Sequence, residues 1–154
     1  MQPGPTKTLA RASTVTTDVA GLCHGTVVLT RRGEVPVQDL RPGDRLVTRD
    51  AGLATVSYIA ASRARFAPVR IRAGSLGHNR PDRDMVTAPG TKLYVRDWRA
   101  QALYGADQAA VPAARLIDGE YVAATAPVTT LVYRIAFDRP HVIYAGGVEV
   151  VVGD

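Results

Sequence analysis

Short apolar runs, separated by glycine, proline or aspartate, dominate the chain from Gly21 onward. Runs of this length that are rich in β-branched and aromatic residues are typical of strands in an all-β domain. The pattern predicts strands at Val27–Leu29, Leu46–Thr48, Thr55–Ile59, Val69–Ile71, Leu93–Val95, Leu131–Ile135 and His141–Tyr144. Their sheets are expected to close around Val28, Leu46, Ile59, Ile71 and Val142.

Two segments depart from this pattern. Residues 1–20 are rich in threonine, serine and proline and have weak periodicity, which predicts a flexible leader with a short strand near Ser13–Thr17. Alanine-rich Ala100–Ala110 predicts a short helical segment that turns Trp98 and Leu103 inward, with a further helical piece at Ala113–Leu116. We therefore expect a leader over residues 1–20 and one β domain over residues 21–154.

Length and composition limit the classes of protein to which the chain can belong. With 154 residues the chain has the length of one domain, and 46% hydrophobic residues are enough for a packed core. No apolar run approaches the roughly 18 residues that span a bilayer, and the polar N-terminus lacks a signal-peptide core, so we expect a cytoplasmic protein without a membrane role. One cysteine and three scattered histidines favour neither a disulfide, a metal site nor a cofactor.

The net charge of +5 raises the hypothesis of a nucleic-acid partner. The charge comes from 17 arginines and only 2 lysines, interleaved with acidic residues and without a basic run, so nucleic acid is an unlikely partner. A basic β-module that uses Arg63, Arg65, Arg70 and Arg72, with Phe66 for base stacking, remains a second alternative. The oligomeric state and any protein partner stay open.

The segment from Gly33 to Thr48, Gly-Glu-Val-Pro-Val-Gln-Asp-Leu-Arg-Pro-Gly-Asp-Arg-Leu-Val-Thr, predicts a tight turn at Pro42-Gly43-Asp44 between strands. It resembles the first block of the Hint fold, the hedgehog/intein self-processing module, and most resembles the bacterial Hint domains of alphaproteobacteria. Val111–Gly119 resembles another block of that family, and the likeness extends over about Gly21–Val150. The resemblance implies a Hint-like, all-β horseshoe fold.

The same resemblance implies chemistry that this chain matches poorly. In that family a cysteine or serine attacks the preceding carbonyl, and a histidine protonates the leaving nitrogen. Aligning Gly25-Thr26 with the family motif Cys-Phe-x-x-Gly-Thr places Gly21 at the nucleophile position and Cys23 two residues late. Cys23 as nucleophile, with His24 or His141 as proton donor, is one alternative, and a buried apolar cysteine is the other.

The two later motifs of the chain differ more from those of the Hint family. Ala88-Pro89 matches the family's Ser-Pro, Thr91 stands where its histidine is expected, and Thr87 precedes them. In the last block His141 falls one residue late, and Gly146 replaces the asparagine that splicing requires. The candidate catalytic residues are thus Cys23, His24, Thr87 and His141.

We expect a degenerate Hint domain that has lost autocatalytic peptide cleavage and acts as a binding or regulatory module, and so is not an enzyme. An active autocatalytic cysteine self-cleaving domain that cuts Leu22–Cys23 by an N–S acyl shift is the alternative. The leader of about twenty residues, with little to release, favours the first hypothesis. The polar loop Gly74–Asp84 is interpreted either as functional or as a plain connection, with His78 as a hydrogen-bonding residue.

Overall fold

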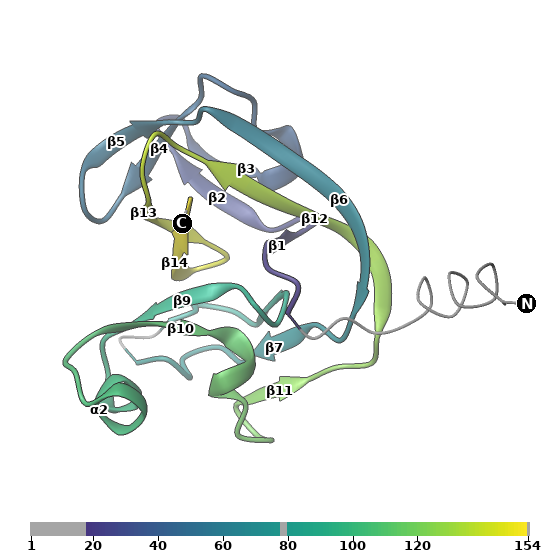
Figure 1. The fold of residues 1–154 in the computed structure, drawn as a ribbon, viewed down its shortest axis with the longest axis vertical. Helices are drawn as coiled ribbons and strands as arrows, with labels where there is room; N and C mark the ends of the chain where they lie inside the picture. Colours follow the sequence, from purple (N-terminus) through teal and green to yellow (C-terminus); the bar gives the residue numbers. More distant parts are fainter. Residues whose placement is uncertain (1–17, 78–79, 154) are drawn as a thin grey trace, which may run out of the picture.

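A computed structural model describes residues 18–77 and 80–153. Its regular elements are mostly β-strands, arranged in three antiparallel sheets (Figure 1). The strands are β1 (Leu22–Cys23), β2 (Val27–Thr30), β3 (Gly33–Pro36), β4 (Arg45–Thr48), β5 (Gly52–Thr55), β6 (Tyr58–Phe66), β7 (Val69–Ile71), β8 (Met85–Thr87), β9 (Lys92–Val95), β10 (Ala109–Pro112), β11 (Val122–Ala124), β12 (Val128–Ala136), β13 (His141–Ala145) and β14 (Val148–Val152). The 3-10 turns η1 (Val37–Asp39) and η2 (Ala113–Leu116) and the helix α2 (Trp98–Tyr104) complete it.

The largest sheet has the order β10-β9-β14-β13-β2-β4-β5, with β3 also paired to β2. A second sheet, β1-β12-β6, is built on two nine-residue strands that run side by side as an arch along one side of the molecule (Figure 1). The third, β11-β7-β8, lies at the lower end of that arch. The predicted all-β Hint-like class with one short helical segment is therefore confirmed.

Side-chain alternation builds the core between these sheets. Val69 and Ile71 of β7 are buried while Arg70 between them is not, and β13 buries every second residue. Val28, Leu46 and Ile71 are fully buried, as predicted. Val142 was a wrong core prediction, because the inward face of β13 carries His141, Ile143 and Ala145 instead.

Two predicted elements differ from the structure. The predicted strand Thr55–Ile59 is split between β5 and β6, because the backbone N–H of Val56 donates to Asp44 and Val56 turns into the core. The predicted helix ends at Tyr104, where Gly105 adopts a left-handed conformation (φ 65°). Ala109 and Ala110 belong to β10 because pairing with β9 outweighs the helix propensity of alanine.

The orientation predicted for the helix was also wrong. Trp98 is 69% exposed and Leu103 lies at the surface, while Arg99 and Ala100 are buried. Asp97 caps the helix by accepting a hydrogen bond from the backbone N–H of Arg99. The predicted strand at Ser13–Thr17 and the predicted role of His78 lie outside the described residues.

Candidate cleft at Gly21

A cleft of about 430 Å³ lies between the arch and the large sheet. Its lining combines the segment that leads into β1, the β8–β9 connection, the start of β6, the end of β12 and the end of β14, including Gly21, Tyr58, Thr91, Tyr133, Arg134 and Val152. Strands β12 and β14 approach each other here although they are not paired. Segments distant in sequence therefore meet around one backbone position, Gly21.

Two threonines hold Gly21. Its backbone N–H donates to Thr91 Oγ1 at 3.0 Å, and Thr91 Oγ1 donates to the Gly21 carbonyl at 2.8 Å. Thr87 Oγ1 approaches the same carbonyl at 3.3 Å. Both threonine side chains are buried, so these bonds satisfy polar groups that have little access to water. The residue at the position expected for histidine thus touches the amide nitrogen of the Ala20–Gly21 bond.

The chain that enters the cleft crosses Gly90. The N–H of Gly90 donates to the Val19 carbonyl at 2.7 Å, and a Cβ on Gly90 would lie 2.6 Å from the Asp18 carbonyl oxygen. Only a residue without a side chain lets the two backbones approach this closely. The described chain is therefore already held from Asp18 onward, within the segment predicted as a flexible leader.

Gly21 offers no reactive atom to this arrangement. Its φ of +146° is a conformation that L side chains rarely adopt, and a Cβ there would meet the Tyr133 carbonyl oxygen at 3.0 Å. Such backbone costs a residue with a side chain about 1–3 kcal/mol. Cleavage of Ala20–Gly21 by an acyl shift has no nucleophile at this position.

Cys23 lies outside the cleft lining, in β1, where it pairs with Val132. Its side chain belongs to a small buried cluster with Phe66, Ala88 and Val132. Burial raises the pKa of the Cys23 thiol to about 11. An apolar, protonated thiol is a weak nucleophile near neutral pH.

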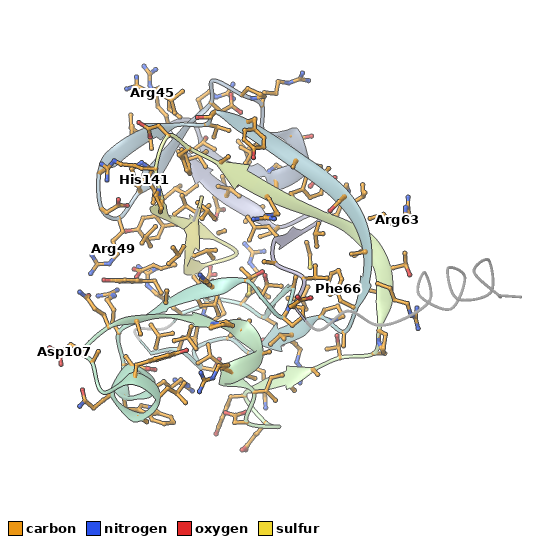
Figure 2. All side chains as sticks on the ribbon, in the orientation of Figure 1. Arg45, Arg49, Arg63, Phe66, Asp107 and His141 are labelled. Carbon is orange, nitrogen blue, oxygen red and sulfur yellow. The ribbon has the colours of Figure 1, made fainter. Side chains whose placement is uncertain are left out.

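Neither candidate histidine of the described chain is hydrogen-bonded to Thr87 or Thr91. The exposed His24 makes a 3.0 Å contact from Nδ1 to the hydroxyl of Tyr133. His141 is 4% exposed, and its Nδ1 lies 2.9 Å from Asp50 Oδ2. Figure 2 shows His141 distant from Phe66, and thus from the cluster that holds Cys23. The structure therefore brings Thr87 and Thr91 together at Gly21 but does not join Cys23, His24 and His141 into one site.

The contact with Asp50 gives the buried imidazole of His141 a hydrogen-bonding partner. Burial favours the neutral acid, but hydrogen bonds from the Val142 N–H and from His141 outweigh it and lower the pKa of the Asp50 carboxyl. An ionised carboxylate only accepts hydrogen bonds, so His141 Nδ1 carries the shared hydrogen. The pair ties the end of β4 to the start of β13.

Stability is expected to decrease on acidification through this pair. Because the folded-state pKa of Asp50 is lowered, its contribution is present above the unfolded value of about 4 and is lost as pH falls through the folded value. Asp50→Asn should be less stable than the unchanged chain at pH 7 and should show a smaller loss between about pH 5 and pH 2. Urea unfolding at pH 7 and between about pH 5 and pH 2 measures the stability of both proteins. If the two stabilities fell in parallel with pH, the stabilising role given to ionised Asp50 would be contradicted.

The glycine that replaces the expected asparagine lies in the turn after β13. Gly146 (φ 62°) turns the chain between β13 and β14, and a Cβ there would meet the flexible end of Met85 at 2.7 Å. The neighbouring Gly147 lies against Pro81 and Asp82, which belong to the Gly74–Asp84 loop. The part of that loop that the structure describes thus packs on the β13–β14 turn.

Several further features bear on function. Phe66, the aromatic residue proposed for base stacking, is completely buried. Arg63 and Arg65 lie on β6, whereas Arg70 and Arg72 lie on or beside β7 in a different sheet. Over residues 18–77 and 80–153, no group of three or more His, Cys, Asp or Glu side chains is arranged to hold a metal ion. No helix in that part of the chain is long and apolar enough to cross a membrane.

These elements define a Hint-type fold, and comparison with solved structures agrees. A bacterial intein-like domain from Clostridium thermocellum is 17% identical with a TM-score of 0.58, covering 88% of this chain and 99% of that one. The MchDnaB-1 intein is 17% identical with a TM-score of 0.53, covering 84% and 98%. The gp41-1 intein is 9% identical with a TM-score of 0.53, covering 87% and 98%. At these identities the likeness concerns the fold.

The family model described as the Hint domain matches residues 20–150. The chain therefore belongs to the Hint domain family. No curated protein sequence matches it.

Proposed function

We propose that this Hint domain no longer cleaves its own chain and acts as a binding or regulatory module. The observation that carries the proposal is Gly21, which lies in the cleft with both its N–H and its carbonyl bound by Thr91. The position aligned with the nucleophile has no side chain, and the position aligned with the proton donor has an alcohol. A threonine hydroxyl does not act as a general acid near pH 7.

Cys23 does not replace the missing nucleophile. The Leu22–Cys23 bond lies within the β1–β12 pairing, and Leu22 is 1% exposed. The thiol belongs to the cluster with Phe66, outside the cleft lining, and its pKa is raised by burial. Attack on the Leu22 carbonyl would need the thiolate in solvent reach and a donor for the leaving nitrogen, and His24 is instead bonded to Tyr133.

The cleft itself supports a binding role. The Asp18–Gly21 segment is held as a bound peptide would be, through hydrogen bonds to its backbone from the Gly90 N–H and with the Thr91 hydroxyl. Tyr58, 59% exposed, and Tyr133 line the same cleft and provide apolar surface beside these polar groups. A self-processing domain without its reacting groups keeps this ability to hold an extended chain.

The acyl shift is tested on a fusion with a folded protein joined before Met1. Hydroxylamine cleaves esters and thioesters, and dithiothreitol cleaves thioesters by thiol exchange, so these reagents release the fused protein if the shift at Cys23 forms a thioester. We expect no reagent-dependent release, from the unchanged chain or from Cys23→Ala. Thr91→Ala serves as a control for the cleft and should also stay intact. Release that requires Cys23 would overturn the proposal and establish cleavage at Leu22–Cys23.

A further inference from the structure

A second polar cluster lies on the outer face of the large sheet, away from the residues that line the Gly21 cleft. Glu149 of β14 pairs directly with Tyr144 of β13, and its neighbours Val148 and Val150 are buried. The Glu149 side chain is only 4% exposed, because arginines from three other segments cover it. These are Arg49 after β4, Arg80 before β8 and Arg96 after β9.

One arginine already satisfies the carboxylate. Arg96 binds it with two hydrogen bonds, Nε to Oε1 at 3.2 Å and Nη2 to Oε2 at 3.0 Å. Arg49 Nε lies 3.4 Å from Oε1, and Arg80 Nη1 lies 3.9 Å from Oε2. A bidentate arginine matches the geometry of a carboxylate, so the two longer contacts leave most of their N–H donors unused by Glu149.

The charges of the cluster do not balance. Three guanidinium groups face a single carboxylate, which leaves two positive charges in excess. Asp97 lines the same hollow, but Arg99 Nη1 pairs with its Oδ2 at 2.5 Å, so Asp97 does not offset that excess. Like charges held together are unfavourable, and an external anion would relieve their repulsion.

Aromatic rings hold two of these arginines in place. The Arg49 guanidinium lies over the Tyr94 ring at 5.3 Å, and that of Arg80 lies over Tyr144 at 5.6 Å. The three arginine side chains are still about a third exposed. Beside them is a small hollow of about 30 Å³, lined by Leu76, Arg80, Tyr94, Arg96, Asp97 and Glu149 among others. Arg80 and Arg96 line the hollow, and Arg49 adjoins it through its contacts with Tyr94 and Glu149. Oriented, accessible guanidinium groups of this kind form a prearranged anion site.

We propose that this arginine cluster binds a phosphoryl group. A phosphate monoester carries close to two negative charges at pH 7, which equals the charge in excess, and its oxygens accept the paired N–H groups of arginine. The small volume of the hollow, about 30 Å³, suits a single terminal group rather than a larger ligand. The inference is independent of the proposed loss of cleavage, because none of these residues touches Gly21.

The test is a titration of the full chain with inorganic phosphate and with O-phosphoserine, followed by amide chemical shifts and calorimetry. We expect saturable binding that weakens with salt and shifts signals near Glu149. Arg49→Gln and Arg80→Gln should each weaken it about fivefold, the value of one ion pair. Arg63→Gln is the matched control, since Arg63 projects from the opposite side of the molecule (Figure 2), and it should bind as the unchanged chain does.

Glu149→Gln distinguishes an anion site from a merely structural ion-pair cluster. It removes the internal anion at nearly equal shape, so phosphate should bind more tightly. Tighter binding of O-phosphoserine than of inorganic phosphate would support a phosphorylated partner, and equal binding would support free phosphate. Absence of saturable binding to the unchanged chain, or equal weakening by Arg63→Gln, would overturn the proposal. Thermal unfolding of Arg80→Gln should match the unchanged chain, since its contact to Glu149 is long.

Discussion

Phe66→Ala is expected to lower the free energy of unfolding by about 3–5 kcal/mol, the cost of truncating a buried phenylalanine. Phe66 is 0% exposed and ends the nine-residue pairing of β6 with β12, opposite Val128. It also packs in the cluster that holds Cys23, Ala88 and Val132. The void left by the ring would be bordered by Cys23, Ala64 and Val132 of one sheet and by Val19 and Ala88 of two connecting segments.

Urea unfolding of the variant measures this loss. Trp98→Ala is a suitable control, because it also truncates a large aromatic side chain but one that is 69% exposed. It should change the free energy of unfolding by less than about 1 kcal/mol. The cluster would not be part of the core if Phe66→Ala were no more destabilising than that control.

The native thiol of Cys23 is expected to react with a disulfide reagent at least about 100-fold more slowly than the same thiol in the unfolded chain. Burial raises its pKa to about 11, so at pH 8 only about one molecule in a thousand carries the thiolate, against about a quarter for an ordinary cysteine. The side chain is also 7% exposed, which limits access of the reagent.

Stopped-flow or spectrophotometric labelling with and without urea gives the two rates. The native rate should rise about tenfold for each pH unit, as the thiolate fraction does. Phe66→Ala provides an internal comparison, because a cavity beside Cys23 should increase the native rate. Rapid native labelling with a rate that levels off near pH 7 would identify an activated cysteine and contradict its structural role.

The strand pattern was predictable because it depends on local alternation. The runs at Val27–Leu29, Leu46–Thr48 and Val69–Ile71 all lie in strands. Predictions that required tertiary information were wrong: the facing of β13 follows from its pairing with β14, and Ala109 and Ala110 follow β9 rather than their helix propensity. Trp98 faces solvent because Arg99 and Ala100 occupy the inner side of α2.

Site residues were predictable only where a motif of the Hint family could be aligned with the sequence. Aligning Gly25-Thr26 placed Gly21 at the nucleophile position, and aligning Ala88-Pro89 placed Thr91 at that of histidine. The two residues are in contact. Asp50 was missed, since 91 residues separate it from His141 and no motif links them. The arginine cluster was missed for the same reason: sequence showed dispersed arginines, and only the sheet order brings Arg49, Arg80 and Arg96 to Glu149.

The intact mass of freshly expressed protein, before and after incubation with dithiothreitol, tests the central claim most directly. We predict one mass, that of the chain still containing the Leu22–Cys23 bond, unchanged by the thiol and by Cys23→Ala. A thiol-dependent fragment that begins at Cys23 and disappears in Cys23→Ala would contradict it, and would show that this Hint domain still cleaves its own chain.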